Sequence, residues 1–408
     1  MDKLLDFISE HLADDTTRLI LDKSKWPEID VETAVNCIES RRKLKGKVQE
    51  WYDEPRLIFP LKLSAEQCSS SATGIYKAQL AVRIVGKTDW KLADLTGGLG
   101  VDSWFFAKEA SQVLYNEMQT PLYNAASHNF HILESGNILL RNRIAEKGKI
   151  SVLLDGFAPD IIYMDPARRG EGGKKVFLIE ECSPDVLTLK DEIFAICRHI
   201  LVKLSPMADI SMVCERLGDK CREVHIVSSD GECKELLIWM DREWTGGFCI
   251  NAVELPAEYP EKEAAVLVFS PEEEKAGWAE LADKVTGYLF EPGKSLTKAG
   301  AFNITGIHFG MGKLGRSTHY YITSDPDKAV QLKKFGKVFR ILSCSPLDKR
   351  SMKEAGKAYP KAEVTARNIP MTSDALRKKI GCSSGGDVHI FGLRSDISGN
   401  LMIAGRRI

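Results

Sequence analysis

Residues 1–75 show the spacing of amphipathic helices. In the segment VETAVNCIESRRKLKGKVQEWY, the apolar residues Val31, Ala34 and Ile38 recur at intervals of three and four positions, and a basic run follows them. Intervals of three and four place side chains on one face of a helix. The pattern therefore predicts a helical N-terminal region.

Residues 76–245 show a different pattern, in which short apolar runs alternate with helical stretches. The runs are KLADL, QVLYNE, ISVLL, DIIYMD, HILVKLS, EVHIVS and ELLIWMD. Such alternation is typical of a parallel sheet with helices on both faces. The last two runs are separated only by SDGECK, which is too short for a crossover helix and contains the turn-forming pair Asp230-Gly231. We therefore predict a seven-stranded α/β core that ends in an antiparallel hairpin.

The remaining residues mix strands and helices on a smaller scale. In residues 246–330, EAAVLVF, GYLFE and THYYIT read as strands, whereas EEKAGWAELADKV and GKSLTKAGAFNI read as helices. In residues 331–408, FGKVFRILS and AEVTARN read as strands and DVHIFGLRS with NLMIAGRR as a hairpin. A helix DALRKKIG is expected between them, with Ser373 as its N-cap and Gly381 as its end. We predict two small α+β modules, and domain boundaries at 1–75, 76–245, 246–330 and 331–408.

Charge is distributed unevenly along the chain. The 408 residues have a formal net charge of −1, but residues 331–408 contain sixteen Lys or Arg against six Asp or Glu. The preceding part contains forty Lys or Arg against fifty-one Asp or Glu. Clustered cations favour a polyanion such as RNA, because phosphate contacts release counterions. The alternative is a lysine-rich surface that faces only solvent.

Composition excludes several classes of protein. With 44% hydrophobic residues the chain is too apolar to be disordered, and it is too long for one typical core. The N-terminus lacks a cationic start followed by an apolar core, and no apolar run approaches the roughly 18 residues that cross a membrane. The ten cysteines form no CxxC pair and no His/Cys cluster at zinc spacing. We expect a reduced, cytoplasmic protein without a metal or a membrane span.

The stretch DLTGGLGVDSWFFAK contains a glycine-rich turn at the end of a predicted strand. Such a turn lets the backbone approach a nucleotide, a dinucleotide or S-adenosylmethionine closely. Asp94, Gly98 and Gly100 fall at the positions of the methyltransferase pattern D-x-G-x-G-x-G, with Thr96 in place of the first glycine. An antiparallel final strand is likewise the mark of the methyltransferase variant of the Rossmann architecture. The turn and the hairpin together favour S-adenosylmethionine, whose ammonium Asp94 would organise directly or through water.

Two further acids follow predicted strands. Glu117 ends QVLYNE, where a carboxylate can accept both hydroxyls of a ribose. Asp155 follows ISVLL, where it would accept a hydrogen bond from the adenine amino group, and Gly156 would leave room for the ring. Each acid alone could instead be a helix cap or a solvated loop residue. Ligands of open α/β sheets bind at the carboxyl ends of the strands, which favours the cofactor site.

The fourth predicted strand is followed by a sequence that carries chemistry. In DIIYMDPARRG, Asp165, Pro166 and Arg168 follow a buried apolar run in a pattern that resembles the (D/N/S)-P-P-(Y/F/W/R) motif of methyltransferases acting on amino groups. A carboxylate and a carbonyl fixed by proline can accept the hydrogens of an exocyclic amine and direct its lone pair. Ala167 replaces the second proline, and an arginine replaces the aromatic residue that would stack on a flipped base. Arg168 and Arg169 could instead hold a phosphate or a carboxylate of the acceptor; a helix cap or an arginine-paired turn is the structural alternative for Asp165.

In combination, several motifs resemble a bacterial family of class I S-adenosylmethionine-dependent methyltransferases that carry a THUMP-like C-terminal domain. The matching segments are EQCSSSATGIYKAQLA, DLTGGLGVD, YMDPARR, VKLSP, YLFEPGKSLTKAGAF and ARNIPMTSDALRKKIG, and they cover most of residues 60–408. The resemblance implies a ferredoxin-like domain between the core and the tail. It also implies methyl transfer to RNA, with tRNA as the usual partner of THUMP domains. The phosphate contacts would then be Lys333, Lys334, Arg367, Arg377, Lys378 and Lys379.

The segment before the core also resembles the cofactor-closing segment of trimethylguanosine synthases. Ser70, Ser71 and Thr73 would cap the helix that precedes the first strand, while Tyr76 and Gln79 would face the methionine end of the cofactor. An ordinary N-cap before an amphipathic helix explains the same residues.

Lys203 lies near the end of the fifth predicted strand. It is expected to approach the acceptor, to pair with Asp165 or to extend its ammonium to solvent.

Other functions stay open on the sequence alone. A dinucleotide-dependent oxidoreductase is disfavoured because no glycine or alanine stands three residues after Gly100. A non-catalytic RNA-binding protein would keep the fold and transfer nothing. A methyltransferase for a small molecule or a protein would explain the missing aromatic residue after Asp165. A covalent route in which Cys182 attacks a pyrimidine ring is a further alternative, which is disfavoured because a buried structural thiol is commoner.

Overall fold

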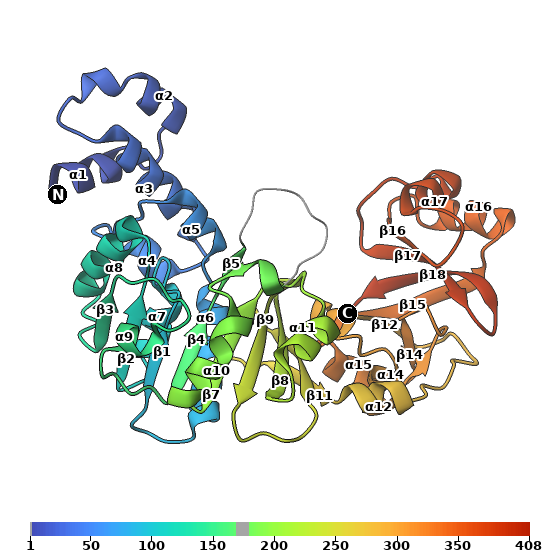
Figure 1. The fold of residues 1–408 in the computed structure, drawn as a ribbon. Coiled ribbons are helices and arrows are strands. Elements are labelled where there is room, and N and C mark those ends of the chain that lie inside the picture. Colours follow the sequence, from blue (N-terminus) through green and yellow to red (C-terminus); the bar gives the residue numbers. More distant parts are fainter. Residues whose placement is uncertain (1, 169–178) are drawn as a thin grey trace. The chain divides into compact units, whose positions relative to one another are not determined.

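The computed structural model describes residues 2–168 and 179–408 of the chain (Figure 1). It divides into two compact units, of which the first comprises Met1–Val224 and Lys234–Gly247 and the second comprises His225–Cys233 and Phe248–Ile408. The division passes through the hairpin formed by β8 (Cys221–Ser229) and β9 (Glu232–Asp241). The four predicted domain boundaries stay a prediction, and those at residues 75 and 330 fall inside helices.

The first unit begins with helices, as the spacing of apolar residues predicted. They are α1 (Asp2–Glu10), α2 (Thr16–Leu21), the 3-10 helix η1 (Lys23–Lys25), α3 (Val31–Leu44), α4 (Gln49–Asp53), α5 (Lys62–Gln67) and α6 (Ser71–Val85). Helix α3 begins after Asp30, whose carboxylate accepts the Thr33 N–H. Its apolar face packs with Phe7, Ile8 and Leu19 into one buried cluster. Burying this face is what stabilises helices as short as α1 and α2.

The sheet of the first unit has the order β9-β7-β4-β1-β2-β3, with β8 beyond β9. Its remaining strands are β1 (Lys91–Asp94), β2 (Gln112–Asn116), β3 (Ile138–Arg141), β4 (Ile161–Met164) and β7 (His199–Leu204). Adjacent strands from β3 to β7 are parallel, whereas β9 is antiparallel to β7. The predicted Rossmann-like core with an antiparallel strand near its end is confirmed.

Helices and two short strands connect these strands. They are α7 (Val101–Ala107), α8 (Thr120–Ile132), α9 (Ile150–Leu154), α10 (Val186–Ile196), α11 (Ile210–Leu217), the 3-10 helix η2 (Ile179–Glu181), β5 (Ala167–Arg168) and β6 (Cys182–Ser183). Parallel neighbours require such crossovers, since a tight turn can join only antiparallel strands. The apolar run of β4 is buried throughout, as expected of a strand covered on both faces.

One predicted strand is wrong. The run ISVLL forms the short helix α9, and the third strand is the preceding run ILLR. In α9 the side chains of Ile150, Leu153 and Leu154 are buried, whereas Val152 is exposed. Burial at intervals of three and four follows a helix, and a five-residue apolar run has no periodicity that separates helix from strand beforehand.

The second unit contains strands of two sheets. Strands β10 (Cys249–Leu255) and β11 (Ala265–Phe269) are antiparallel and continue the sheet beyond β8 in the order β11-β10-β8, and the other sheet has seven strands. The seven-stranded sheet has the order β13-β14-β12-β15-β18-β17-β16, formed by β12 (Tyr288–Pro292), β13 (Gly312–Lys313), β14 (Tyr321–Thr323), β15 (Gly336–Pro346), β16 (Glu363–Arg367), β17 (Val388–Ser395) and β18 (Gly399–Arg407). The predicted module 246–330 is therefore divided. Its EAAVLVF strand, β11, lies in the sheet with β10 and β8, whereas β12, β13 and β14 share the seven-stranded sheet with the tail, joined where β12 pairs with β15.

Helices of the second unit are short. They are α12 (Pro271–Ala276), α13 (Lys294–Lys298), α14 (Asn303–Phe309), α15 (Pro326–Leu332), α16 (Lys349–Ala358) and α17 (Ser373–Ile380). The helix predicted for EEKAGWAELADKV is much shorter than expected, because α12 ends at Ala276. The helix predicted for GKSLTKAGAFNI is two helices, which are separated at Gly300, where φ is 70°. Helix α17 ends at Gly381 as predicted, but its N-cap is Thr372, whose hydroxyl accepts the Ala375 N–H, rather than Ser373.

Candidate active site

Three predicted acids meet at one edge of the sheet in the first unit. Asp94 is the last residue of β1, Glu117 follows β2 and Asp165 follows β4. Strand β1 lies between β2 and β4 and is parallel to both, so the carboxyl ends of the three strands are neighbours. This is the edge at which open α/β sheets bind ligands.

The glycine turn between β1 and α7 is shaped by contacts with β2. Gly98 and Gly100 have φ angles of 54° and 93°, which side-chain-bearing residues rarely adopt. A Cβ on Gly97 would lie 2.1 Å from the ring of Tyr115, whose hydroxyl donates to the Gly98 carbonyl at 2.6 Å. The turn therefore requires glycine for both its conformation and its packing.

Glu117 holds this turn from the side of β2. Its side chain is 6% exposed, one carboxylate oxygen accepts the Gly98 N–H at 2.8 Å, and the other accepts the Gln119 N–H at 2.7 Å. Each oxygen keeps acceptor capacity beyond these bonds, because a carboxylate oxygen has two lone pairs. The residue is thus placed beside the turn, as a ribose-binding carboxylate would have to be.

Asp94 is fully enclosed and organises the start of the turn. Its carboxylate accepts the Ser103 hydroxyl at 2.6 Å and the Thr96 N–H at 2.9 Å. Burial raises its pKa to about 7, although these two hydrogen bonds act in the opposite direction, and the carboxylates of Asp102 and Asp165 raise the pKa further. Asp94 is therefore a carboxyl group whose charge changes near neutral pH.

Thr96 connects the glycine turn to the segment that contains Asp165. Its hydroxyl oxygen accepts the Asp165 N–H at 2.6 Å. This contact explains what the threonine adds at a position where the methyltransferase pattern has glycine. Because the bond spans β1 and β4, the backbone of the DPA segment is fixed relative to the turn.

Asp165 forms an ion pair with Lys203 of β7. The Lys203 ammonium donates to one oxygen of Asp165 at 2.5 Å, and the side chains are 12% and 37% exposed. Burial lowers the pKa of Lys203, but the nearby carboxylates of Asp165, Asp102 and Glu235 outweigh it and leave that pKa raised. Lys203 is therefore a cation at all physiological pH values, and the predicted pairing with Asp165 is found.

Sequence reasoning missed a second buried cation beside this site, Lys77 of α6. Its side chain is 0% exposed, and its ammonium contacts Glu235 of β9 at 2.8 Å and 2.9 Å, Ser69 at 2.9 Å and Asp102 of α7 at 3.3 Å. The other Asp102 oxygen accepts the Tyr163 hydroxyl at 2.8 Å. A lysine on the face that also carries Gly74, Ala78 and Ala81 was the available signal.

The predicted adenine contact is displaced from the strand ends. Asp155 is the left-handed C-cap of α9 rather than the residue after a strand, and its side chain is 63% exposed. Its carboxylate lies 3.5 Å from the guanidinium of Arg141, while Gly156 is exposed with a φ of 80°. The reason for assigning Asp155 and Gly156 to the adenine no longer holds, because it depended on ISVLL being a strand.

Other predicted residues lie in the places that their elements dictate. Tyr76 is partly buried in α6, which begins with the predicted capping box between Ser70 and Thr73. Pro166 is buried, and the backbone of Arg168 in β5 is in register with Cys182 of β6, whose thiol is fully buried. Arg169 lies outside the described residues.

The predicted RNA-binding residues lie in the second unit. Arg377 of α17 pairs with Asp374 at 2.7 Å and is partly buried, whereas Lys378 and Lys379 are exposed in the same turn. Arg367 is exposed at the end of β16. The last turn of α17 therefore presents two cations to solvent.

Two kinds of feature are not found in the described part of the chain. Residues 2–168 and 179–408 contain no group of three His, Cys, Asp or Glu side chains that could hold a metal ion. They also contain no helix that is both long enough and apolar enough to cross a membrane.

The observed donors and acceptors fit the cofactor predicted from the sequence. The turn offers backbone without side chains at Gly98 and Gly100, Glu117 offers a buried carboxylate, and Asp165 offers a carboxylate one hydrogen bond away from the turn. The strand order with an antiparallel β9 and this site at the strand ends define a Rossmann-like fold of the class I methyltransferase type.

Comparisons with known proteins place the chain more narrowly. Residues 288–329 match a family described as a ferredoxin-like domain, and residues 336–407 match a family described as THUMP domain-like. The chain is similar to the crystal structure of a candidate methyltransferase from Porphyromonas gingivalis W83, with 28% sequence identity and a TM-score of 0.85. That match covers 99% of this chain and 97% of the other. The resemblance predicted from the sequence motifs is confirmed.

More distant matches add nothing to this conclusion. An rRNA methylase from Streptococcus thermophilus is 13% identical with a TM-score of 0.31, over 41% of this chain and 96% of that one. A methyltransferase from Geobacter sulfurreducens is 16% identical with a TM-score of 0.30, over 43% and 82%. Such values support no inference about activity. No curated protein sequence matches the chain.

Proposed function

We propose that the chain transfers a methyl group from S-adenosylmethionine to an exocyclic amino group of an RNA base. The observation that carries this proposal is the hydrogen bond from the Asp165 N–H to Thr96, which fixes an acceptor-side carboxylate beside the glycine turn. Catalysis of this kind depends on holding the acceptor nitrogen in line with the methyl group. The match to a methyltransferase candidate over nearly the whole chain supports the same reaction.

Residues around the turn would hold the cofactor. Glu117 would accept the ribose hydroxyls with its remaining lone pairs, and the Gly98 and Gly100 backbone would allow close approach. Asp94 and Tyr76 would line the end that takes the methionine group. When bound, the cofactor supplies an electrophilic methyl group on a sulfonium.

Asp165 and Lys203 would act on the acceptor side. With one oxygen of Asp165 engaged by the Lys203 ammonium, the other can accept an N–H of the acceptor amine. The role of Asp165 is to orient the amine and to accept its proton as positive charge develops on the nitrogen. The Pro166 carbonyl provides a second acceptor in a segment whose φ is fixed by the ring.

RNA as the substrate is supported by the second unit. A THUMP-like match spans residues 336–407, and the tail that contains it carries an excess of ten positive charges over residues 331–408. Phosphate backbones select such clusters. In the described structure none of the ten cysteines forms a disulfide, in keeping with work in the cytoplasm, where RNA and S-adenosylmethionine are available.

Substitution of Asp165 tests the mechanism. Asp165→Ala should leave cofactor affinity near wild type and lower turnover on RNA by roughly 10²–10⁴-fold, the usual scale for a lost acid–base group. Cys182→Ala should change turnover little, since the thiol is buried. The substrate is found by mass spectrometry of nucleosides from cells with and without the gene. Full turnover in the Asp165 variant, or lost turnover in a folded Cys182 variant, would reject the assignment.

A further inference from the structure

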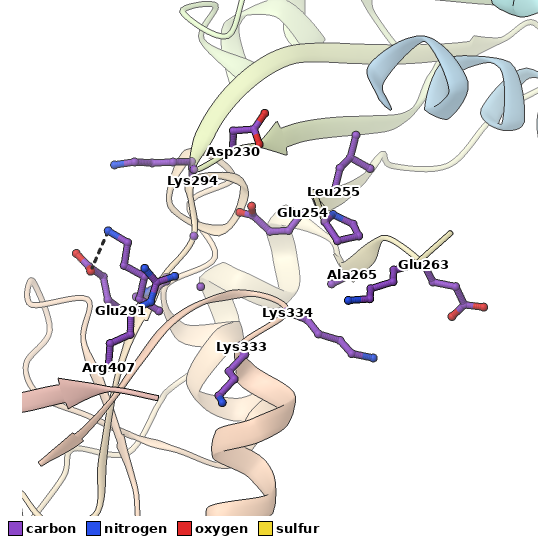
Figure 2. Close-up of a pocket in the computed structure, with 17 residues that line it drawn as sticks. Asp230, Glu254, Leu255, Glu263, Ala265, Glu291, Lys294, Lys333, Lys334 and Arg407 are labelled. Atoms are coloured by element: carbon purple, nitrogen blue, oxygen red, sulfur yellow. Dashed lines mark ion pairs between the residues drawn. The ribbon is translucent and has the colours of Figure 1, made fainter. Parts of the chain in front are cut away.

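A cavity of about 510 Å³ lies in the second unit, apart from the residues of the glycine turn. Its wall is formed by the turn after β8, the end of β10, the start of β11, the turn between β12 and α13, the segment between α15 and β15, and the end of β18 (Figure 2). Cavities of 300–1,000 Å³ are the usual size for small-molecule sites. The space is therefore large enough for one nucleotide.

Basic side chains outnumber acidic ones around this cavity. The basic residues are Lys262, Lys294, Lys333, Lys334, Lys337 and Arg407, and the acidic residues are Asp230, Glu254, Glu263 and Glu291. Two of the lysines have carboxylate partners, since Lys337 lies 3.9 Å from Glu291 and Lys262 lies 3.1 Å from Glu258. These pairs leave four basic residues to be accounted for.

The four remaining cations have no carboxylate within 4 Å among the described residues. They are Lys294, Lys333, Lys334 and Arg407, all exposed. Glu254 interacts electrostatically with Lys294, and one of its oxygens also accepts the Ser295 N–H at 2.8 Å and the Ser295 hydroxyl at 2.7 Å. An excess of cations around one hollow favours an anionic ligand.

Backbone contacts hold the cation-bearing segments together. The Gly293 N–H, next to Lys294, donates to the Phe335 carbonyl at 2.8 Å, next to Lys334. Arg407 is held by strand pairing, since it is in register with Phe339 of β15. The backbone segments that carry these cations are therefore held by the sheet and by the turns, so a ligand would have to order only the side chains.

Part of the wall is apolar. Leu255, Pro256, Ala265 and Pro292 line the cavity without polar side chains. An apolar wall beside a group of cations suits a ligand with a flat ring at one end and a phosphate at the other. Inorganic phosphate alone would leave this wall unused.

We propose that this cavity binds a phosphate-bearing nucleotide, with the phosphate on Lys294, Lys333, Lys334 and Arg407 and the base against the apolar wall. The nucleotide is either free or part of an RNA strand. Only the choice of an RNA strand as its source rests on the proposed function, because the chemistry of the cavity is the same in both cases.

Titrations of the full chain test this site. Binding of AMP is measured by calorimetry, and binding of a fluorescein-labelled 12-nucleotide RNA is measured by fluorescence anisotropy. Both titrations use the wild type and the double variant Lys333→Gln, Lys334→Gln. Both lysines are exposed, so the fold should persist. The variant should bind AMP or RNA, whichever the wild type binds, at least tenfold more weakly, and the affinity should depend less steeply on salt concentration. The matched control is Lys349→Gln, Lys353→Gln on α16, which removes the same charge outside the cavity and should change affinity less than twofold.

The probes separate the two sources. Binding of AMP that the RNA does not displace identifies a free nucleotide, whereas RNA binding without AMP binding identifies a strand. Failure of wild type to bind either probe, or equal losses in the cavity variant and the α16 control, would overturn the proposal. A parallel titration with S-adenosylhomocysteine distinguishes this proposal from the proposed function. A chain that binds AMP or RNA in the cavity but does not bind the cofactor product would contradict the proposed function and leave the nucleotide site supported.

Discussion

The first unit contains a group of buried charged residues beside the site. Lys77 is fully buried, and its charge is balanced by Glu235 and Asp102. Removing one partner from such a group leaves an uncompensated buried charge, which costs more than the pair itself contributes. The arrangement is therefore sensitive to single substitutions, and it holds α6, α7 and β9 in a fixed relation around the site.

Glu117 allows the cofactor site to be tested at one residue. Glu117→Ala removes the carboxylate that we assign to the ribose, so cofactor affinity should fall by roughly 1.5–3 kcal/mol, as for hydrogen bonds to charged groups. Because Glu117 also accepts the Gly98 N–H, Glu117→Gln serves as the control that keeps an acceptor at the turn. Isothermal titration that finds unchanged affinity in the alanine variant would remove Glu117 from the site.

Asp94 predicts a pH dependence of stability. Burial raises its pKa from the ordinary 3.8 to about 7, so the stability contributed by its protonated form is complete below about pH 4 and is lost as pH rises through 7. Asp94→Asn has no such titration. The free energy of unfolding of wild type relative to this variant should fall by at most about 1.4 kcal/mol per pH unit between pH 4 and 7 and level off above.

Urea unfolding of both proteins at pH 4.5, 6.0 and 7.5 measures this difference. A constant difference at all three pH values would show that Asp94 keeps an ordinary pKa. The predicted decrease would show instead that burial dominates over the hydrogen bonds from Ser103 and Thr96.

Sequence reasoning located some of these residues and missed others for identifiable reasons. Asp94, Glu117 and Asp165 could be placed because each directly follows an apolar run that ends a strand. The pairing of Lys77 with Glu235 could not be predicted, since 158 positions separate them and only the fold makes them neighbours. Asp155 was misplaced because a run of five apolar residues fits a helix as well as a strand.

At the scale of elements, the glycine turn shows how β2 determines the shape of a loop that follows β1. Tyr115 of β2 contacts the turn through its ring and its hydroxyl, and Glu117, which follows β2, contacts the turn through its carboxylate. The loop is therefore held by side chains from another strand, in addition to its own sequence.

Gly97 provides a test of this dependence. Gly97→Ala would place a Cβ 2.1 Å from the Tyr115 ring, which must move, and overpacking of this kind costs typically 1–3 kcal/mol of folding stability. Gly136→Ala is the matched control, because no atom lies within 4 Å of its Cβ position. Chemical unfolding should separate the two variants, and equal stabilities would contradict the packing described for the turn.

Most elements of the core could be predicted because their signals are local. The hairpin of β8 and β9 follows from the short SDGECK connection, and α6 follows from its capping residues. The junction of β12 with β15 has no comparable local signal. Strand pairing across residues 288–346 depends on which edges are available after each part has folded, and that information is absent from the periodicity of either strand.

At the scale of the whole molecule, the basic tail predicts salt-dependent binding of RNA. The triple variant Arg377→Glu, Lys378→Glu, Lys379→Glu reverses the last turn of α17 and should weaken RNA binding. The slope of log affinity against log salt should flatten by about one unit for each lost phosphate contact. Because Arg377 already pairs with Asp374, we expect the two exposed lysines to account for most of the change.

Lys349→Glu, Lys353→Glu, Lys357→Glu on α16 is the control with the same change of net charge. Filter binding across a salt series compares the two variants. Equal RNA affinity of wild type and the α17 variant at every salt concentration would make this part of the tail a solvated surface, and equal losses in both variants would indicate a general effect of charge.

The seven-stranded sheet of the second unit limits how its two matched domains can be exchanged between proteins. The ferredoxin-like match ends at residue 329 and the THUMP-like match begins at 336, yet β12 from the first is paired along its length with β15 from the second. Removing either part would leave the paired strand of the other with an exposed edge, which promotes aggregation. We therefore expect that residues 288–408 can be moved to another protein or deleted only as one piece, although two separate family descriptions match them.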